Sequence, residues 1–526
     1  MAMRKLLLPL LAANGASLAV ASEVMSTEAI AAELRSLKEE VAAMGQKVSP
    51  AQDQLSTLLR EERKLQAVTF VTQAAFDTEV NSFNGALDSA WLILCGALVM
   101  IMHAGFAMLE TGCCRAKNAQ NVLMKNLVNV CVGTMGWYFF GWAVAMGGPM
   151  NDKGYLENHF IGTKGFAGSN FLTQPTLGQV DALNGANTSP MLLWFFQWAF
   201  CTAGATIVSG GVAERVKSPS YALFAFVMAS FIYPVVVAWT WGYGWLSEVF
   251  DVGYMDFAGS GIVHLTGGVS ALAGTIVLGP RKGRFDPDRA EEFEAHSLPL
   301  VVLGTFILWF GWYGFNPGST LGMHTAETGA KAAQIAMNTT LAAATGGITV
   351  FAFRYLLTKK YDVGGLCNGI LAGLVSITAG CSNMECGSAF ATGLIGAFVY
   401  QGASMLLVRL KIDDPVDASP VHMFCGIWGC LATVLFDWGK GFDHFNGWSG
   451  FSCMAGDDGA CLTGIGGKAI AANVVMIIVI CLWAGSLSGA TFFALRMTGA
   501  LRIDDDTEHV GLDHKQHSPS KAYSID

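Results

Sequence analysis

Charged residues are scarce in this sequence, and that scarcity excludes most classes of soluble protein. Asp, Glu, Lys and Arg make up 13% of the 526 residues, while hydrophobic residues make up 52%; soluble domains average about 25% charged residues. The net charge of −9 provides no basic surface for nucleic acid. A phosphate-binding loop, a metal-ligand spacing and a covalent catalytic arrangement are also lacking. We therefore predict a polytopic membrane protein that is not an enzyme and needs no cofactor, metal or nucleic-acid partner.

Glycine and long apolar runs are abundant instead. Glycine accounts for 62 residues, well above the average share of roughly 7%, as is typical of helices that pack closely within a lipid bilayer. Beyond Asp88 the apolar runs are long enough to predict eleven transmembrane helices in an all-α fold. Their approximate ranges are 89–109, 120–147, 189–212, 220–243, 259–279, 297–315, 332–353, 364–380, 387–407, 420–436 and 467–494.

Basic residues favour alternate connections between these helices. Beyond residue 88, most Lys and Arg residues lie in the C-terminal tail and in the connections near 110–119, 213–219, 280–296, 354–363 and 408–419. Because basic residues are retained on the cytoplasmic side, this pattern predicts an N-terminus outside and a C-terminus inside. An odd number of spans agrees with that orientation.

The residues before the first predicted span form two segments. Residues 1–21 combine two basic residues, a short apolar run and the small-residue pattern Ala-Val-Ala, which predicts a cleavable signal peptide, with an uncleaved first helix as the alternative. Residues 22–87 are polar and are predicted to be extracellular. Within them, apolar residues at alternating spacings of four and three favour a short coiled coil, although a solitary surface helix explains them equally well. The membrane domain then covers residues 88–496, and residues 497–526 form a cytoplasmic tail.

Two histidines interrupt predicted membrane spans. His264 lies in DFAGSGIVHLTGG and His422 lies in DASPVHMFCGIWG. A titratable side chain in hydrocarbon is costly unless it faces the protein interior, a pore or a partner. Each histidine lies near the end of a five-helix half, so we predict one central site formed by both halves. A structural pair that only holds the two halves together is the alternative.

Three aromatic clusters lie at the predicted outward ends of spans. They are WFFQWAF at 194–200, WTWGYGW at 239–245 and FGWYGFNPGST at 310–320. Aromatic faces beside a hydroxyl group can replace part of a cation's hydration shell, because the ring quadrupole attracts positive charge. The clusters therefore predict a cation-binding site. An aromatic belt at the bilayer surface explains any one of them taken alone.

With these motifs the sequence resembles the ammonium transporters of the Amt/Mep/Rh superfamily. From about residue 88 to residue 516 the motifs follow the order of that family: GFAMLETG with RAKN, GGVAER, DFAGSGIVHLTGG, GWYGFNPGS, DDPVDASPVHMFCGIWG and GLDHKQHS. The resemblance implies a homotrimer in a lipid bilayer, with one pore per subunit between two inverted five-helix halves and an eleventh helix packed across them. It also implies ammonium or ammonia as substrate and a regulatory partner at the C-terminal tail. We expect the plasma membrane, with an organellar membrane as the alternative.

The resemblance further implies an outer substrate site and a gate. Phe196, Trp241 and Ser319 would recruit the cation. Phe196 and Phe315 would form a stacked phenyl gate below it. Trp241 and Ser319 favour the Amt branch, because Rh-type members usually lack their equivalents.

By the same resemblance, His264, His422 and Trp312 would line the pore. Asp256 would organise the outer site. A carboxylate in that position either caps a helix N-terminus, which we favour, or binds the substrate directly. Glu110 stands where some bacterial relatives have an aromatic residue near the inner mouth, so the chemistry at that mouth is left open.

Histidine chemistry supplies a mechanism for such a pore. Ammonium and potassium ions are similar in size and charge, so a pore that requires a transferable proton would distinguish them. Ammonia would cross an apolar passage that repels hydrated cations, and the proton would travel along imidazoles, which can both donate and accept. Two other functions remain open: an ammonium sensor that signals through its tail, and an Rh-like passage for neutral gas.

The chain has 13 cysteines. Cys381 with Cys386, and Cys453 with Cys461, fall in predicted outward loops, where oxidising surroundings could close two short disulfides. The remaining cysteines are predicted to serve as small packing residues.

Overall fold

The computed structural model describes residues 31–32, 35–36, 39, 56–60, 73–169, 171, 190–437 and 467–523. The chain divides into two compact units, Met1–Glu79 and Val80–Asp526. The predicted signal peptide lies outside the described residues, as does most of the predicted coiled coil. The second unit contains all of the predicted membrane domain.

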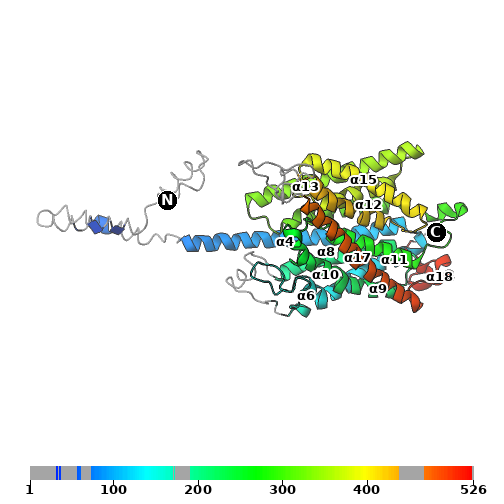
Figure 1. Ribbon diagram of the computed structural model, residues 1–526, viewed down its shortest axis with the longest axis horizontal. Coiled ribbons are helices and arrows are strands. Elements are labelled where there is room, and N and C mark those ends of the chain that lie inside the picture. Colours follow the sequence, from blue (N-terminus) through cyan, green and yellow to red (C-terminus); the bar gives the residue numbers. More distant parts are fainter. Residues whose placement is uncertain are drawn as a thin grey trace. The chain divides into compact units, whose positions relative to one another are not determined.

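Helices make up the second unit, and no strand occurs among its described residues (Figure 1). The helices up to residue 278 are α4 (Gln73–Cys113), which begins in the first unit, α5 (Ala119–Gly136), α6 (Trp142–Met146), α8 (Pro190–Gly211), α9 (Ser218–Val227), α10 (Tyr233–Trp239), and the π turn η8 (Ser260–Leu265) with α11 (Thr266–Leu278). Those that follow are α12 (Leu298–Phe315), the 3₁₀ turn η10 (Pro317–Thr320), α13 (Ala326–Thr358), α14 (Val363–Thr378), α15 (Cys386–Arg409), the π turn η11 (Ser419–Phe424) with α16 (Cys425–Leu435), and α17 (Lys468–Met497). The prediction of an all-α fold is confirmed.

Nine helices in the described part of the chain are long and apolar enough to cross a membrane, and two shorter apolar helices, Val363–Thr378 and Ser419–Leu435, accompany them. Each of the eleven predicted ranges overlaps one of these helices. The boundaries differ most for α4, which begins at Gln73 whereas its apolar run begins at residue 89. Hydropathy marks where a helix becomes apolar, and a polar helix can continue beyond that point.

The helices differ in how much of their surface other helices cover. In α8 and in the η8–α11 helix, 78% of the most apolar window is buried, whereas the share is 28% in α13 and in α17. α11 packs against α8, η11 and α17. The centre of the bundle is therefore formed by α8 and α11, while α13 and α17 present most of their surface outward.

Two helices, α11 and α16, begin with a π turn instead of regular α-helix. These turns are η8, at the start of α11, and η11, at the start of α16. π turns interrupt the regular hydrogen-bond ladder and occur frequently at functional sites. Each turn contains one of the two histidines singled out in the sequence.

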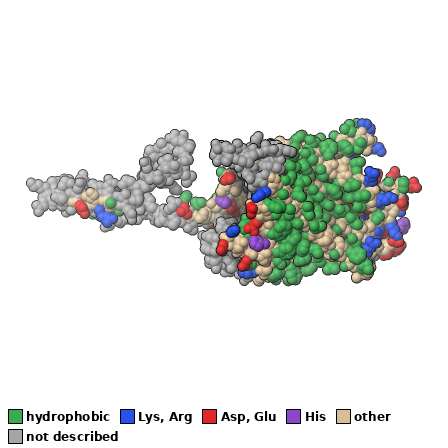
Figure 2. All heavy atoms as spheres, in the orientation of Figure 1, with side chains coloured by type: hydrophobic (Ala, Val, Ile, Leu, Met, Phe, Trp, Pro, Cys, Tyr) green, Lys and Arg blue, Asp and Glu red, His purple; other side chains and the backbone are tan. Residues whose placement is uncertain are grey.

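Apolar side chains form a broad belt across the visible face of the second unit, and charges gather at its ends. Figure 2 shows this belt over the helices, with Lys and Arg concentrated at the end that holds the C-terminus. Large apolar side chains are exposed on the helices; that of Leu127, on α5, is 70% exposed. Such a surface is stable only when lipid or another apolar surface covers it. We call the end with the C-terminus the tail end, and the other the opposite end.

The C-terminal tail packs against the tail end of the bundle through backbone hydrogen bonds. Lys217 N–H donates to the Leu501 carbonyl oxygen at 2.9 Å, and Ile503 N–H donates to the Arg215 carbonyl oxygen at 3.1 Å. The tail then forms α18 (Asp505–Val510) and α19 (Leu512–Gln516). The Asp513 carboxylate accepts two backbone N–H bonds at the start of α5, both at 2.9 Å. The tail is thus an integral part of this end of the bundle.

Beneath the tail lies a buried charge cluster. The Glu214 carboxylate is bound by Arg115 and Arg281, and Arg281 also donates to Asp413 at 2.8 Å. Burial by itself would raise the pKa of Glu214, but the two guanidiniums outweigh burial and hold this pKa below its ordinary value. The cluster therefore stays ionised and ties the connection after α8 to the one after α11.

Candidate functional site

The two histidines predicted to share a central site are in direct contact. His264 on η8 is 1% exposed and His422 on η11 is 4% exposed. Their Nδ1 atoms lie 3.2 Å apart, and the rings are nearly parallel, at 22°. A single hydrogen bond between two neutral imidazoles requires one ring to donate from Nδ1 and the other to accept there, which leaves the accepting ring protonated on Nε2. The pair can thus take a proton at one Nε2 and release one at the other.

A carboxylate holds each histidine helix at its N-terminal end. Asp256 accepts four backbone N–H bonds, from residues 259 to 262, at 2.8 to 2.9 Å. Asp414 accepts two, from Ala418 at 3.0 Å and from Ser419 at 2.7 Å. N-terminal helix donors are otherwise unsatisfied, and a carboxylate is their strongest acceptor.

Sequence reasoning missed Asp414, although a signal was present. In both halves an Asp precedes the histidine by the same interval, in DFAGSGIVH and in DPVDASPVH. Internal similarity of this kind is typical of transporters built from two related halves. The two histidine helices are therefore held in the same manner.

Aromatic rings cover one side of the histidine pair. His264 stacks on Trp312 and on Phe315, with ring centroids 5.2 Å and 5.3 Å away. Trp312 is fully buried, and its indole N–H donates to the Thr378 hydroxyl at 3.0 Å. These contacts restrict the His264 ring, and its Nε2 has no hydrogen-bond partner in the described protein. That buried nitrogen therefore keeps an unused hydrogen-bonding position.

The predicted phenyl gate contains a different residue from α8. Phe200, and not Phe196, packs against Phe315, with centroids 4.2 Å apart. Phe196 lies one helical turn further along and contacts Phe200 at 4.8 Å. Both phenylalanines occupy the same face of α8, since they are four residues apart. The predicted stacking of Phe196 on Phe315 is therefore wrong, because the α8 ring in contact with Phe315 is Phe200.

The three residues predicted to recruit substrate adjoin this aromatic pair. Trp241 meets Phe200 edge-on at 5.8 Å, and its indole N–H donates to the Asp256 carbonyl oxygen at 3.2 Å. Ser319 lies on η10, one turn after Phe315, and donates to the Phe315 carbonyl oxygen at 2.8 Å. Phe196 touches Phe200 as described. A cavity of about 640 Å³ borders Trp241 and Asp256.

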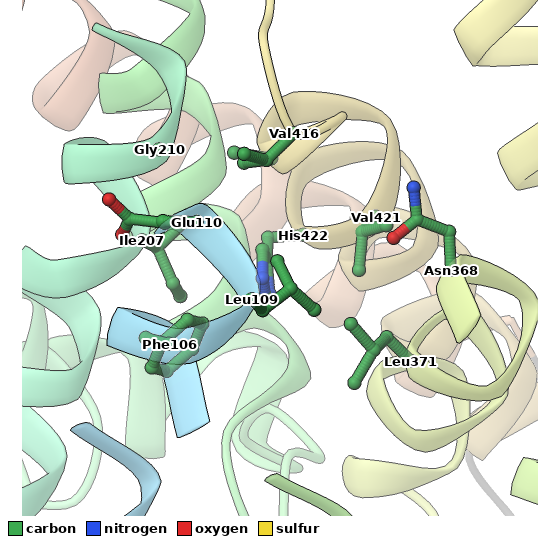
Figure 3. A pocket seen from close by; sticks show the side chains of 11 residues that line it. Phe106, Leu109, Glu110, Ile207, Gly210, Asn368, Leu371, Val416, Val421 and His422 are labelled. Carbon is green, nitrogen blue, oxygen red and sulfur yellow. The ribbon is translucent and has the colours of Figure 1, made fainter. Parts of the chain in front are cut away.

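On the other side of His422 lies a small apolar cavity. It has a volume of about 20 Å³ and is lined by residues that include Phe106, Leu109, Ile207 and Val421 (Figure 3). The Phe106 ring lies 6.0 Å from the His422 ring. This volume suffices for about one water molecule, and its apolar lining offers a hydrated cation little compensation for lost water.

Glu110 also borders this cavity, but its polar contacts are internal. Its carboxylate accepts from Ser209 at 2.7 Å and from Asn126 at 3.1 Å, and lies 3.6 Å from Lys125. Glu110 and Lys125 are each 1% exposed. A buried pair of opposite charges with hydrogen bonds joins α4, α5 and α8 near the tail end.

The predicted bridge between Cys381 and Cys386 is not formed. The Cys381 thiol is buried and donates to the Thr378 carbonyl oxygen at 3.3 Å, while Cys386 is a separate thiol at the start of α15. Short sequence spacing did not bring the sulfurs together, because the Cys381 side chain is turned into the protein. The second predicted pair, Cys453 with Cys461, lies outside the described residues.

Comparisons with known proteins identify the family of this chain. Residues 90–523 match the Ammonium Transporter Family. The chain is 38% identical over 451 residues to Ammonium transporter 1 member 3 of Solanum lycopersicum, covering 83% of this chain and 93% of that relative. It is also 38% identical over 443 residues to Ammonium transporter Amt2 of Archaeoglobus fulgidus, covering 82% and 87%.

Solved structures give the same result. A protein titled Sensor Amt Protein superimposes with a TM-score of 0.70 at 30% identity, covering 83% of this chain and 99% of that chain. Candida albicans Mep2 superimposes with a TM-score of 0.67 at 28% identity, covering 81% and 88%. Matches of this extent in both sequence and structure show that this multi-pass membrane protein belongs to the Ammonium Transporter Family.

Proposed function

We propose that this protein transports ammonium across a membrane by separating it into ammonia and a proton. The contact between His264 and His422, enclosed by aromatic rings on one side and an apolar cavity on the other, carries this proposal. A hydrated cation cannot cross such a passage without losing its water. Neutral ammonia can cross it, provided that its proton moves by another path.

The imidazole pair provides that path. Its shared Nδ1 hydrogen bond allows a proton to enter at one Nε2 and leave at the other, with the internal proton shifting between the rings. Potassium carries no transferable proton, so it would be excluded even though it matches ammonium in size and charge. Selectivity would then come from deprotonation and not from the outer site.

The residues around Phe200 would act before this step. Phe196, Trp241 and Ser319 would hold the cation by ring faces and a hydroxyl, which attract a cation without dehydrating it completely. Phe200 and Phe315 would form the gate, and their close contact requires a ring movement for passage. Asp256 would act on the site through the backbone, because four N–H donors already occupy its oxygens.

We further propose eleven membrane spans, with the N-terminus outside and the C-terminus inside, in a plasma-membrane homotrimer. The concentration of Lys and Arg at the tail end supports that orientation, since basic residues are retained in the cytoplasm. The exposed apolar belt offers surface for both lipid and neighbouring subunits. Native mass spectrometry in detergent would test the trimer, and N-terminal sequencing would test removal of residues 1–21.

A sensor is the second candidate function, and the packed tail supports it. Ser220 Oγ donates to the Ala500 carbonyl oxygen at 2.7 Å, so the tail contacts the helices that follow α8 directly. Substrate binding could therefore alter the tail and any partner bound to it. The similarity to a protein titled as a sensor adds to this possibility.

Currents from purified protein in liposomes test the transport proposal. On a solid-supported membrane, ammonium pulses should elicit current in the wild type and potassium pulses should not. Replacing both pore histidines, His264→Ala with His422→Ala, should abolish the ammonium current or its selectivity. A double variant of two tail histidines, His509→Ala with His514→Ala, controls for histidine loss. Absence of wild-type current, with an ammonium response of a fluorescent label on the tail, would favour the sensor.

A further inference from the structure

Side chains of α4 hold the segment that carries Ser319 in place. It comprises η10 and the residues up to Thr325, and it includes Leu321 in the left-handed conformation at φ 57°. Such short irregular segments have few hydrogen bonds of their own and depend on their neighbours for position. The proposed outer site contains Ser319, so the neighbours of this segment determine where its hydroxyl lies.

Three α4 residues contact the segment from a single helix face. They are Asp88, Trp91 and Cys95, whose spacing of three and four places them side by side. The Trp91 indole N–H donates to the Thr320 hydroxyl at 3.1 Å. At Gly318, an added Cβ would lie 2.6 Å from Cys95 Cβ and 3.2 Å from the Phe196 ring. The segment is therefore closely packed between α4 and the residues of the outer site.

Asp88 makes the strongest of these contacts. It is 5% exposed, and its Oδ1 accepts backbone N–H bonds from Met323 at 2.7 Å and from His324 at 3.2 Å. Its Oδ2 lies 2.7 Å from Nδ1 of the His324 ring. Gly322 passes so close that an added Cβ would lie 2.7 Å from Oδ1. A largely buried carboxylate with several donors makes strong, directional bonds, and its loss leaves those donors unpaired.

We propose that Asp88 is a positioning residue for the outer ammonium site. It fixes the segment from Pro317 to Thr325 so that Ser319 faces the aromatic rings. This role rests on the proposed transport function. It acts on substrate capture and not on the histidine pair, because no contact of Asp88 reaches η8 or η11 in the described structure.

The experiment measures ammonium-dependent current against ammonium concentration for Asp88→Asn in liposomes. Asparagine retains the size of aspartate but loses the charge and one acceptor. We expect the half-saturating concentration to rise about tenfold, the effect of roughly one lost charge-assisted hydrogen bond. The maximal current should stay within about twofold of wild type, since an interaction used only in capture changes KM and leaves kcat. Exclusion of potassium should be unchanged.

Matched variants separate this role from charge loss and from misfolding. Glu327→Gln removes an exposed acid from the first turn of α13, close behind the segment, and should leave the half-saturating concentration unchanged. Trp91→Phe removes only the hydrogen bond to Thr320 and should raise the half-saturating concentration by a smaller factor than Asp88→Asn does. If Asp88→Asn does not fold, the half-saturating concentration of Trp91→Phe tests the proposal in its place.

Each outcome has one meaning. A raised half-saturating concentration with a preserved maximal current supports the positioning role. An unchanged half-saturating concentration, or a fall in maximal current alone, overturns it. Failure of wild type to carry ammonium current overturns the proposed function, and this role with it, whereas wild-type current with unaffected variants overturns the role of Asp88 alone.

Discussion

Replacing Asp256 by asparagine distinguishes a capping carboxylate from one that binds substrate. The aspartate accepts four buried backbone N–H bonds, two on each oxygen. The single carbonyl oxygen of asparagine can keep two of them, and its NH₂ group then faces the other two donors. At about 1–3 kcal/mol for each buried donor left unpaired, the loss amounts to about 2–6 kcal/mol. This is a large share of the stability of a typical domain, which is about 5–15 kcal/mol.

Asp414 provides a matched comparison within the same protein. It accepts only two backbone N–H bonds, so Asp414→Asn should leave about one donor unpaired, at a cost of about 1–3 kcal/mol. Thermal unfolding of both variants in detergent should therefore show a smaller loss for Asp414→Asn than for Asp256→Asn. An equal loss, or the reverse order, would refute the hydrogen-bond accounting.

Transport by the folded fraction of Asp256→Asn tests the second half of the reasoning. If Asp256 acts through the helix start, refolded or lipid-stabilised protein in which that start has re-formed should retain a half-saturating ammonium concentration close to that of wild type. If the carboxylate binds the cation directly, affinity should collapse even in protein that is stably folded. Currents normalised to the amount of folded protein separate these two results.

Three further predictions follow from particular contacts. Phe200→Ala, which removes the ring packed against Phe315, should change the maximal ammonium current more than Phe196→Ala does, while both variants still exclude potassium, as measured with ammonium and potassium pulses. Because the pKa of Glu214 is lowered in the folded protein, its ionisation stabilises the fold above the unfolded-state pKa of about 4. The unfolding temperature should therefore fall as the pH drops below that value. Glu214→Gln should lose this pH dependence and should also be less stable than wild type at neutral pH. Gly268→Ala should separate the histidine helices and abolish transport, because the added Cβ would lie 2.2 Å from a backbone nitrogen of η11. The control Gly402→Ala places its Cβ where nothing lies within 4 Å, so it should change neither transport nor the unfolding temperature.

Features that depend on local composition were predictable from the sequence. The low charge and the length of the apolar runs indicated a membrane protein, because bilayer thickness imposes a minimum length on each span. The positions of His264 and His422 in otherwise apolar runs pointed to one shared site. Burying a lone imidazole is costly, so two of them at corresponding positions suggested that they meet.

Features that depend on how helices slide and rotate against one another were not predictable. Phe196 and Phe200 lie on the same face of α8, and a shift of one turn, about 5.4 Å, decides which ring meets Phe315. The polar start of α4 gave no hydropathy signal. Asp88 likewise looked like an ordinary polar residue at a helix start, since its partners are more than 230 residues away in the chain.

The sequence by itself determined the all-helical membrane class, the approximate helix ranges and the identity of the central histidines, because each follows from the transfer of side chains from water to lipid. Only the tertiary structure showed which α8 ring meets Phe315, that the sulfurs of Cys381 and Cys386 are not joined, and that the Ser319 segment is attached to α4. These depend on distances of a few ångströms between residues remote in sequence, which only close packing of the whole bundle can set.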